Sequence, residues 1–277
     1  MKEAIGLLHA FAQNLNPQIG THMKKTAQLA RRVAEAYQLD QYACDHITMA
    51  GLIHDIGLLA LPKDLQTKDV TLLSDAQLRD YYEHPLAAAI TLEQMPETAP
   101  VGEIVLYHHE YMNGQGFPNG LSGSEIPLAS RILLVASDYS RVVTTWPRDM
   151  RKVISYVRRH LDGDDYKRFT FSDDPEQIIE ESAAKILLKD PDEKYDVEVV
   201  NTLIRVVNRA KNIDPTSMLD IERLKPGMTL MEDVRTQAGR LLLTKDTQLN
   251  DAAIRSLQSI HAQGLLGARV YVAVPEP

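Results

Sequence analysis

Apolar side chains recur at helical spacing through most of the first 212 residues. Such periodicity is typical of amphipathic helices that bury one face in a shared core. Asn16 with Pro17, Asp40 and Gly57 supply boundary signals, because Asn and Asp cap helix starts and Gly ends helices. The pattern predicts a mainly α fold, with helices over residues 3–15, 18–39, 41–56, 101–111, 128–142, 175–188 and 195–212.

The pattern changes after Asp214 and Pro215. Two short β-rich runs, 229–235 and 240–244, surround Gly239, and a helical run at 251–263 precedes a last strand at 269–274. We therefore divide the chain into a helix at 1–16, a helical domain at 17–214 and a small α+β domain at 215–277. A linker from an upstream domain is one interpretation of the first helix. The α+β domain carries no chemical motif, so we expect it to serve docking to signalling proteins or homodimer formation.

Histidines and aspartates lie at positions on the predicted helix faces where apolar residues are usual. Burying an imidazole or a carboxylate there costs free energy unless a partner compensates it. Taken singly, His22 could be a core histidine, His84 a cap-like structural residue and Asp138 a partly exposed carboxylate. Taken together, the set predicts a metal site made of His22, His54, Asp55, His84, His108, His109 and Asp138.

The chemistry of the set indicates two ions rather than one. Imidazoles suit transition metals, and a carboxylate can bridge two of them. Five histidines and two aspartates exceed the protein ligands of a single catalytic zinc. Paired ions are typical of phosphoester hydrolysis, because they activate water and clamp the phosphoryl oxygens.

Composition narrows the partners of such a site. The formal charge of −8 over 277 residues argues against binding to a DNA or RNA polymer, which requires a basic surface. Cys44 is the only cysteine, so the chain forms no internal disulfide, and we expect a cytoplasmic protein. The sequence contains no uninterrupted apolar run long enough for a transmembrane helix and no recognisable signal peptide.

In order and spacing these residues resemble the HD-GYP branch of the HD phosphohydrolases. His54 to Gly57 read as the family's H-D-I-G, His84 and Pro85 as its H-P, and His108 to Glu110 as its H-H-E. The GQGFPNGL run at 114–121 is similar to the segment that gives the family its G-Y-P name. His22 and Asp138 fall where the family has its first-helix histidine and late-helix aspartate. The resemblance covers residues 16–145 closely and 195–208 weakly.

The resemblance implies a helical HD-domain bundle and a metal-dependent phosphodiesterase for cyclic di-GMP in bacterial signalling. It assigns Asp55 as the catalytic, metal-bridging residue, with the other six as ligands of two divalent ions, iron or manganese. Gly116, Phe117 and Pro118 would contact substrate or a signalling partner. Glu110 would either orient an imidazole from behind or face solvent. The product would be the linear dinucleotide or GMP.

Several positions depart from the family pattern. Leu58 stands where a phosphate-binding lysine usually follows H-D-I-G, Phe117 replaces the tyrosine, and Arg141 interrupts the usual D-x-x-D-A. Lys63 and Arg148 are candidate replacements for the phosphate contact, although both also fit a solvated surface. If a phosphate contact is what the chain lacks, Leu58→Lys should raise turnover. The alternative function is a catalytically weak regulatory module that binds metal or nucleotide and acts through protein contacts; hydrolysis of mononucleotides fits the GQGFP loop less well.

The stretch at 147–194 is longer and more charged than the resemblance leads us to expect. We interpret it as a helical insertion that covers the metal cleft, with a solvated spacer as the alternative.

Overall fold

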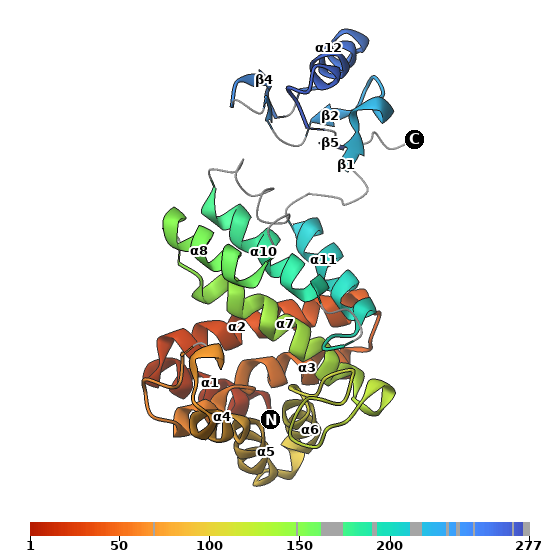
Figure 1. Ribbon diagram of the computed structural model, residues 1–277. Helices are drawn as coiled ribbons and strands as arrows, with labels where there is room; N and C mark the ends of the chain where they lie inside the picture. Colours follow the sequence, from red (N-terminus) through yellow and green to blue (C-terminus); the bar gives the residue numbers. More distant parts are fainter. Residues whose placement is uncertain are drawn as a thin grey trace. The chain divides into compact units, whose positions relative to one another are not determined.

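The computed structural model in Figure 1 describes residues 1–68, 70–147, 149–161, 174–189, 193–210, 218–230, 233–236, 239–245, 247–267 and 269–273. Its contacts separate two compact units, Met1–Ile204 and Arg205–Pro277. The division lies within the helix Val197–Ala210, before the boundary at 214 that the sequence suggested.

Helices make up almost all of the first unit, which confirms the mainly α fold. Its longest helix is α2, whose buried face runs from Ile19 to Ala34 and packs against α3 and α7. None of the described helices has the length and apolar character that crossing a membrane would require. The α-helices are α1 (Lys2–Leu15), α2 (Pro17–Ala36), α3 (Gln41–Ile53), α4 (Asp75–Tyr82), α5 (His84–Glu93), α6 (Ala99–Leu106), α7 (Leu128–Thr145), α8 (Met150–His160), α10 (Pro175–Lys189) and α11 (Val197–Ala210).

The expected caps form at the starts of α2 and α3. The side chain of Asn16 accepts hydrogen bonds from the N–H groups of Gln18 and Ile19, and Pro17 occupies the first turn. Asp40 accepts from the N–H of Ala43. These bonds satisfy N–H groups that would otherwise lack partners, which explains why the helices begin at these residues.

Two helices end earlier than the periodicity predicted, and both corrections shape the site. α3 stops at Ile53 and is followed by the 3₁₀ turn η1 (Ile56–Ala60), while α6 stops at Leu106. Adjacent residues on an α-helix diverge by about 100°. Because 54–55 and 108–109 lie where a helix has ended, the two side chains of each pair can approach a common point. His46 of α3 is buried, and its Nδ1–H donates to the carbonyl of Tyr42.

A glycine allows η1 to approach the start of α5. A Cβ at Gly57 would collide with the backbone carbonyl of His84. The fourth residue of the H-D-I-G run therefore lets the chain after Asp55 pass directly beside the next histidine, a contact that any side chain would block.

The described part of the insertion contains two helices, α8 and α10. They share an apolar cluster in which Trp146, Val153, Val157, Ile178 and Ile179 are buried, and α10 also packs on α7. Residues 162–173 and 190–192 of the insertion lie outside the described part of the chain.

The second unit is a small α+β fold with its own core. A three-stranded antiparallel sheet has the order β1-β5-β2, formed by Met218–Asp220, Arg269–Ala273 and Thr229–Leu230. β3 (Val234–Arg235) pairs with β4 (Leu241–Leu243) in a separate hairpin. α12 (Asp251–Ala262) buries Ile254 and Leu257 in the same core.

Candidate metal centre

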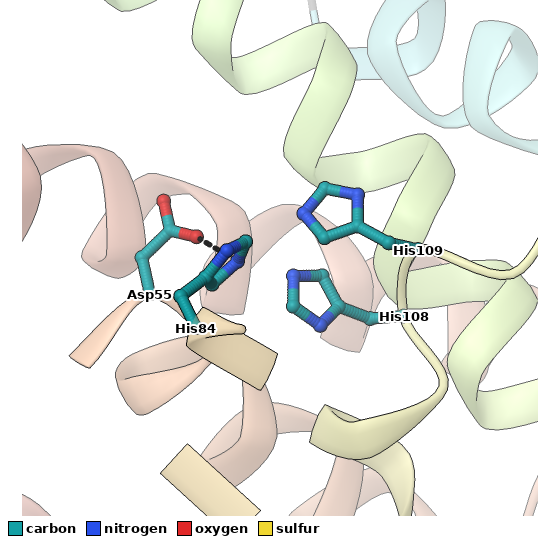
Figure 2. A group of neighbouring side chains, drawn as sticks. All are labelled: Asp55, His84, His108 and His109. Atoms are coloured by element: carbon teal, nitrogen blue, oxygen red, sulfur yellow. Dashed lines mark ion pairs between the residues drawn. The ribbon is translucent and has the colours of Figure 1, made fainter. Parts of the chain in front are cut away.

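Six of the seven predicted ligands come together in the interior of the first unit. Ligand atoms of Asp55, His84, His108 and His109 all lie within 4.8 Å of one another, and Figure 2 shows these side chains converging. Those of His22, His54 and Asp55 form a second group within the same limit. Asp55 belongs to both groups, so its two carboxylate oxygens can serve neighbouring ions.

Backbone carbonyls hold three of the imidazoles in one orientation. The Nδ1–H of His54 donates to the carbonyl of Gly51 at 2.9 Å, and those of His84 and His108 donate to Tyr81 and Val105, each at 2.6 Å. A carbonyl can only accept, so Nδ1 carries the proton and Nε2 presents a lone pair to the site. Histidines that bind metals are commonly oriented in this way.

Several of the inward-facing atoms lack hydrogen-bond partners within the described residues. The Nε2 atoms of His84, His108 and His109 and one oxygen of Asp55 are buried without a hydrogen bond. The Nε2 atoms of His22 and His54 lie 3.3 Å apart and each 3.5 Å from Asp55 Oδ2. Unpaired buried acceptors are costly, and a divalent cation would satisfy several at once. The donor set therefore fits metal ions.

Burial sets the protonation state of these groups. It lowers the pKa of His22, His108 and His109 well below the usual value, and it lowers that of His54 as well. Neutral imidazoles keep their lone pairs for a metal. Burial alone would raise the pKa of the Asp55 carboxyl, but the neighbouring His54 and Arg141 groups hold it well below its ordinary range. Asp55 is therefore a carboxylate.

Arg141 is a site residue that the motif order did not assign. It lies three positions after Asp138 on α7, and its Nη2 is 3.4 Å from Asp55 Oδ2. A charged residue among the mostly buried positions of α7 is the sequence feature that could have identified Arg141. Leu58, at the position of the family lysine, is 1% exposed and belongs to an apolar cluster with Ala12, Ile19 and Met23. The cation beside the carboxylate thus comes from α7.

Asp138 is in neither ligand group, because its carboxylate has partners from the chain. Its Oδ2 lies 2.7 Å from Lys194 Nζ and accepts a hydrogen bond from the Tyr195 hydroxyl at 2.8 Å. Burial alone would raise the pKa of Asp138, but Lys194, with Arg141 and the Tyr195 hydroxyl, holds it below its ordinary value. No local pattern in the sequence indicated Lys194 or Tyr195. Their contact with Asp138 depends on how the chain returns after the insertion.

Both aspartates line one pocket of about 400 Å³. Its walls combine metal-site residues with Arg141 and Lys194 and with aromatic side chains from several elements. Tyr156 and His160 of α8 and Ile186 of α10 belong to the lining, so helices of the insertion form part of the wall. The volume lies in the range of small-molecule sites.

The GQGFP loop is fastened to the histidine pair. Glu110 is 1% exposed, and its two oxygens accept hydrogen bonds from the N–H groups of Asn119 at 2.6 Å and Leu121 at 2.9 Å. Its carboxylate therefore holds the loop rather than an imidazole. A Cβ at Gly116 would overlap the backbone of residues 109–111. Phe117 stacks on His109 at 4.7 Å between ring centroids.

Of the other residues predicted to contact substrate, some line the pocket and some do not. Phe117 lines the pocket, whereas Pro118, joined to it by a cis peptide bond, is exposed. Lys63 is exposed and does not line the pocket. Arg148 lies outside the described residues.

Comparison with known proteins gives the same family as the motifs. A family profile described as HD domain matches residues 7–155. The 3'3'-cGAMP-specific phosphodiesterase 1 of Vibrio cholerae is 29% identical over 144 residues, which are 50% of this chain and 33% of that protein. The cyclic di-GMP phosphodiesterase response regulator RpfG of Xanthomonas campestris is 30% identical over 145 residues, which are 50% of this chain and 38% of that protein. The chain thus spans well under half the length of either relative.

Among solved structures, an HDG"Y"P protein of Bdellovibrio bacteriovorus, Bd1817, aligns with a TM-score of 0.51 at 20% identity. The alignment covers 75% of this chain and 62% of that one. At this identity the likeness concerns the fold alone.

Proposed function

Because the chain belongs to the HD-domain family, we propose that it is a metal-dependent phosphodiesterase that hydrolyses cyclic di-GMP to the linear dinucleotide or GMP. The observation that carries the proposal is the position of Asp55, which belongs to two groups of buried imidazoles, one of which has Nε2 atoms without a hydrogen bond. The names of the relatives, phosphodiesterases for cyclic di-GMP and for 3'3'-cGAMP, support a cyclic dinucleotide as the substrate class.

The proposed ligands divide between two ions, for which we expect iron or manganese. Asp55 would contribute to both, with His22 and His54 on one side and His84, His108 and His109 on the other. Such ions, when bound, lower the pKa of water and polarise the phosphoryl oxygens. The backbone carbonyls that fix the imidazoles keep the ligand geometry in place before substrate arrives.

Other residues of the pocket suit a nucleotide. The Arg141 guanidinium beside Asp55 is placed to hold a phosphate oxygen, the role that Leu58 cannot fill. Tyr82, Phe117 and Trp146 line the pocket with faces on which guanine bases could stack. Burial of these bases would also exclude water from the reacting phosphate, which strengthens electrostatic contacts.

The direct test is turnover of cyclic di-GMP, 3'3'-cGAMP and cyclic di-AMP by the anaerobically purified full chain, with bound metal measured on the same samples. We expect cleavage of cyclic di-GMP with iron or manganese. Asp55→Ala should lose metal and reduce turnover by roughly 10³-fold or more, because a bridging ligand supports both ions. Asp64→Ala, which changes an exposed aspartate, is the matched control. Cleavage that persists in Asp55→Ala would refute the mechanism.

A regulatory module is the second candidate. Two observations favour it. Leu58 is buried at the position of the family lysine. Each aspartate of the pocket also has a cation of the chain beside it, Arg141 at Asp55 and Lys194 at Asp138. This function predicts that metal or nucleotide binds while none of the three cyclic dinucleotides is cleaved. Signalling proteins would then dock on the GQGFP loop or on the second unit, and the complex rather than the product would carry the signal.

A further inference from the structure

Asp138 is held by a short segment that follows α10. Lys194 places its ammonium 2.7 Å from Asp138 Oδ2, and the Tyr195 hydroxyl donates to the same oxygen at 2.8 Å. The Asp138 side chain is 17% exposed and the Lys194 side chain 30%. The pair is therefore shielded from water far more than a typical surface ion pair, so its mutual attraction is weakly screened.

Backbone and aromatic contacts fix Lys194 in this position. The N–H groups of Met112 and Asn113 donate to the carbonyls of Lys194 and Glu193 at 3.3 and 2.8 Å. The ammonium lies 5.0 Å from the ring centroids of both Tyr111 and Tyr195. Such preorganisation reduces the entropy that Lys194 loses on pairing with the carboxylate.

The same carboxylate lines the pocket that His22 and Asp55 of the three-ligand group also line. Ser137, its neighbour on α7, has its Oγ 3.3 Å from His22 Nε2 and 3.2 Å from His54 Nε2. Asp138 and His22 line the same pocket. An ion held by His22, His54 and Asp55 would have three protein ligands, and Asp138 is the nearby carboxylate that could add a fourth.

We propose that Lys194 is a built-in competitor for this fourth ligand, so that the two ion positions load unequally. This inference rests on the proposed metal centre. The group of Asp55, His84, His108 and His109 fills first, and the group of His22, His54 and Asp55 binds a divalent ion weakly until Lys194 releases Asp138. Charge favours the same order, because Arg141 and Lys194 already face the two carboxylates and would repel a second dication.

Manganese binding to the full chain tests the competition without reference to activity. Equilibrium dialysis with metal analysis and titration calorimetry would be applied to the wild type, Lys194→Met and Lys189→Met. Lys189 is an exposed lysine at the end of α10 and is the matched control. We expect one strong and one weak Mn²⁺ site in the wild type. Lys194→Met should tighten the weak site by about tenfold or more, since it removes a unit charge beside the ion, while Lys189→Met should change neither site.

A double-mutant cycle separates competition from a general change in the fold. In the Asp138→Asn background, Lys194→Met should tighten Mn²⁺ binding much less, because the contested ligand is gone and only the loss of the lysine charge remains. Lys194→Gln is the second variant if the methionine disturbs folding, which circular dichroism would report. Two sites of equal affinity in the wild type, an unchanged or weaker second site in folded Lys194 variants, or no Mn²⁺ binding at all would overturn the inference.

The outcome is distinguishable from that of the proposed function. Unequal loading that responds to Lys194, without cleavage of cyclic di-GMP, would reject the enzyme and keep the competition. Cleavage of cyclic di-GMP with equal loading of the two ion positions would support the enzyme and reject the competition.

Discussion

Asp55 and Asp138 line the same pocket, yet the fold treats the two carboxylates differently. Asp55 faces neutral imidazoles whose Nε2 atoms are largely unpaired, with Arg141 at 3.4 Å as its cation from the chain. Asp138 belongs to neither ligand group and is bound at 2.7 Å by Lys194. Unpaired acceptors attract a cation from solution, whereas a carboxylate with its own ammonium is already compensated. Asp55 is thus arranged to bind an ion from solution, whereas Asp138 is arranged to pair with a lysine of the same chain.

The largest effect should come from placing a lysine at Leu58, in the apolar cluster that follows Asp55 in the sequence. The expectation that Leu58→Lys raises turnover is revised, because Leu58 is 1% exposed in an apolar cluster with Ala12, Ile19 and Met23. A lysine there would bury an unpaired charge and should destabilise the fold on the order of 3–5 kcal/mol. Thermal and urea unfolding would measure the loss.

Leu58→Met conserves volume and polarity and is the control, with an expected cost below about 1.5 kcal/mol. A stable Leu58→Lys protein with raised turnover would show instead that this side chain can reach the pocket.

Removing the Arg141 guanidinium, which lies beside Asp55 in the pocket, should reduce turnover more than it reduces the stability of the fold. Arg141→Met is expected to lower turnover of the cyclic dinucleotide by roughly 10²-fold, the size of effect seen when one transition-state contact is lost. Bound metal should be retained or increased, because a positive charge near Asp55 has gone. Steady-state kinetics and metal analysis on the same samples would separate these effects.

Arg79→Met, on the exposed face of α4, is the matched control. Unchanged turnover in Arg141→Met would assign Arg141 to charge balance at Asp55 rather than to the substrate.

The Glu110 carboxylate belongs to neither ligand group and, in the described part of the chain, forms no ion pair. Its oxygens accept from two N–H groups of the GQGFP loop. Glu110→Gln would place an amide donor against one of them, so we expect a loss of about 1–3 kcal/mol in the free energy of unfolding. Urea denaturation would measure it.

Glu125→Gln in the 3₁₀ turn Gly123–Glu125, just after the loop, is the comparison, because Glu125 is exposed and water can replace its bonds to Ser122. An equal loss in the two variants would mean that burial of Glu110 adds nothing.

Asp45 shows what a carboxylate with two cations contributes outside the pocket. Hydrogen bonds from Lys2 and Arg31 lower its pKa to about 2. Because the folded pKa lies below the unfolded value near 4, the stabilisation is fully present above about pH 4 and is lost as the pH falls through about 2. Asp45→Asn should therefore lower the thermal midpoint slightly at pH 7 and not at all near pH 2.

Thermal unfolding between pH 2 and 7 would check this, with exposed Asp64→Asn as control. A difference between wild type and Asp45→Asn that grows on acidification would reverse the sign and contradict the assignment.

The sequence by itself determined the helical class, most helix positions and a set of ligand candidates. Caps such as Asn16 and Asp40 and the period of apolar residues act over a few positions, so they can be recognised without the fold. The order of the histidines and aspartates indicated a metal centre, and the tertiary structure brings six of those seven side chains into two groups that share Asp55.

Only the tertiary structure decided how the seventh ligand and the charged residues are used. The early ends of α3 and α6 let each adjacent pair, 54–55 and 108–109, converge on the site. Leu58 is buried because residues of α1, α2 and α4 pack against η1, and Arg141 reaches the pocket from α7. Lys194 meets Asp138 across a long stretch of chain, and no local preference encodes a contact that exists only after the helices have packed.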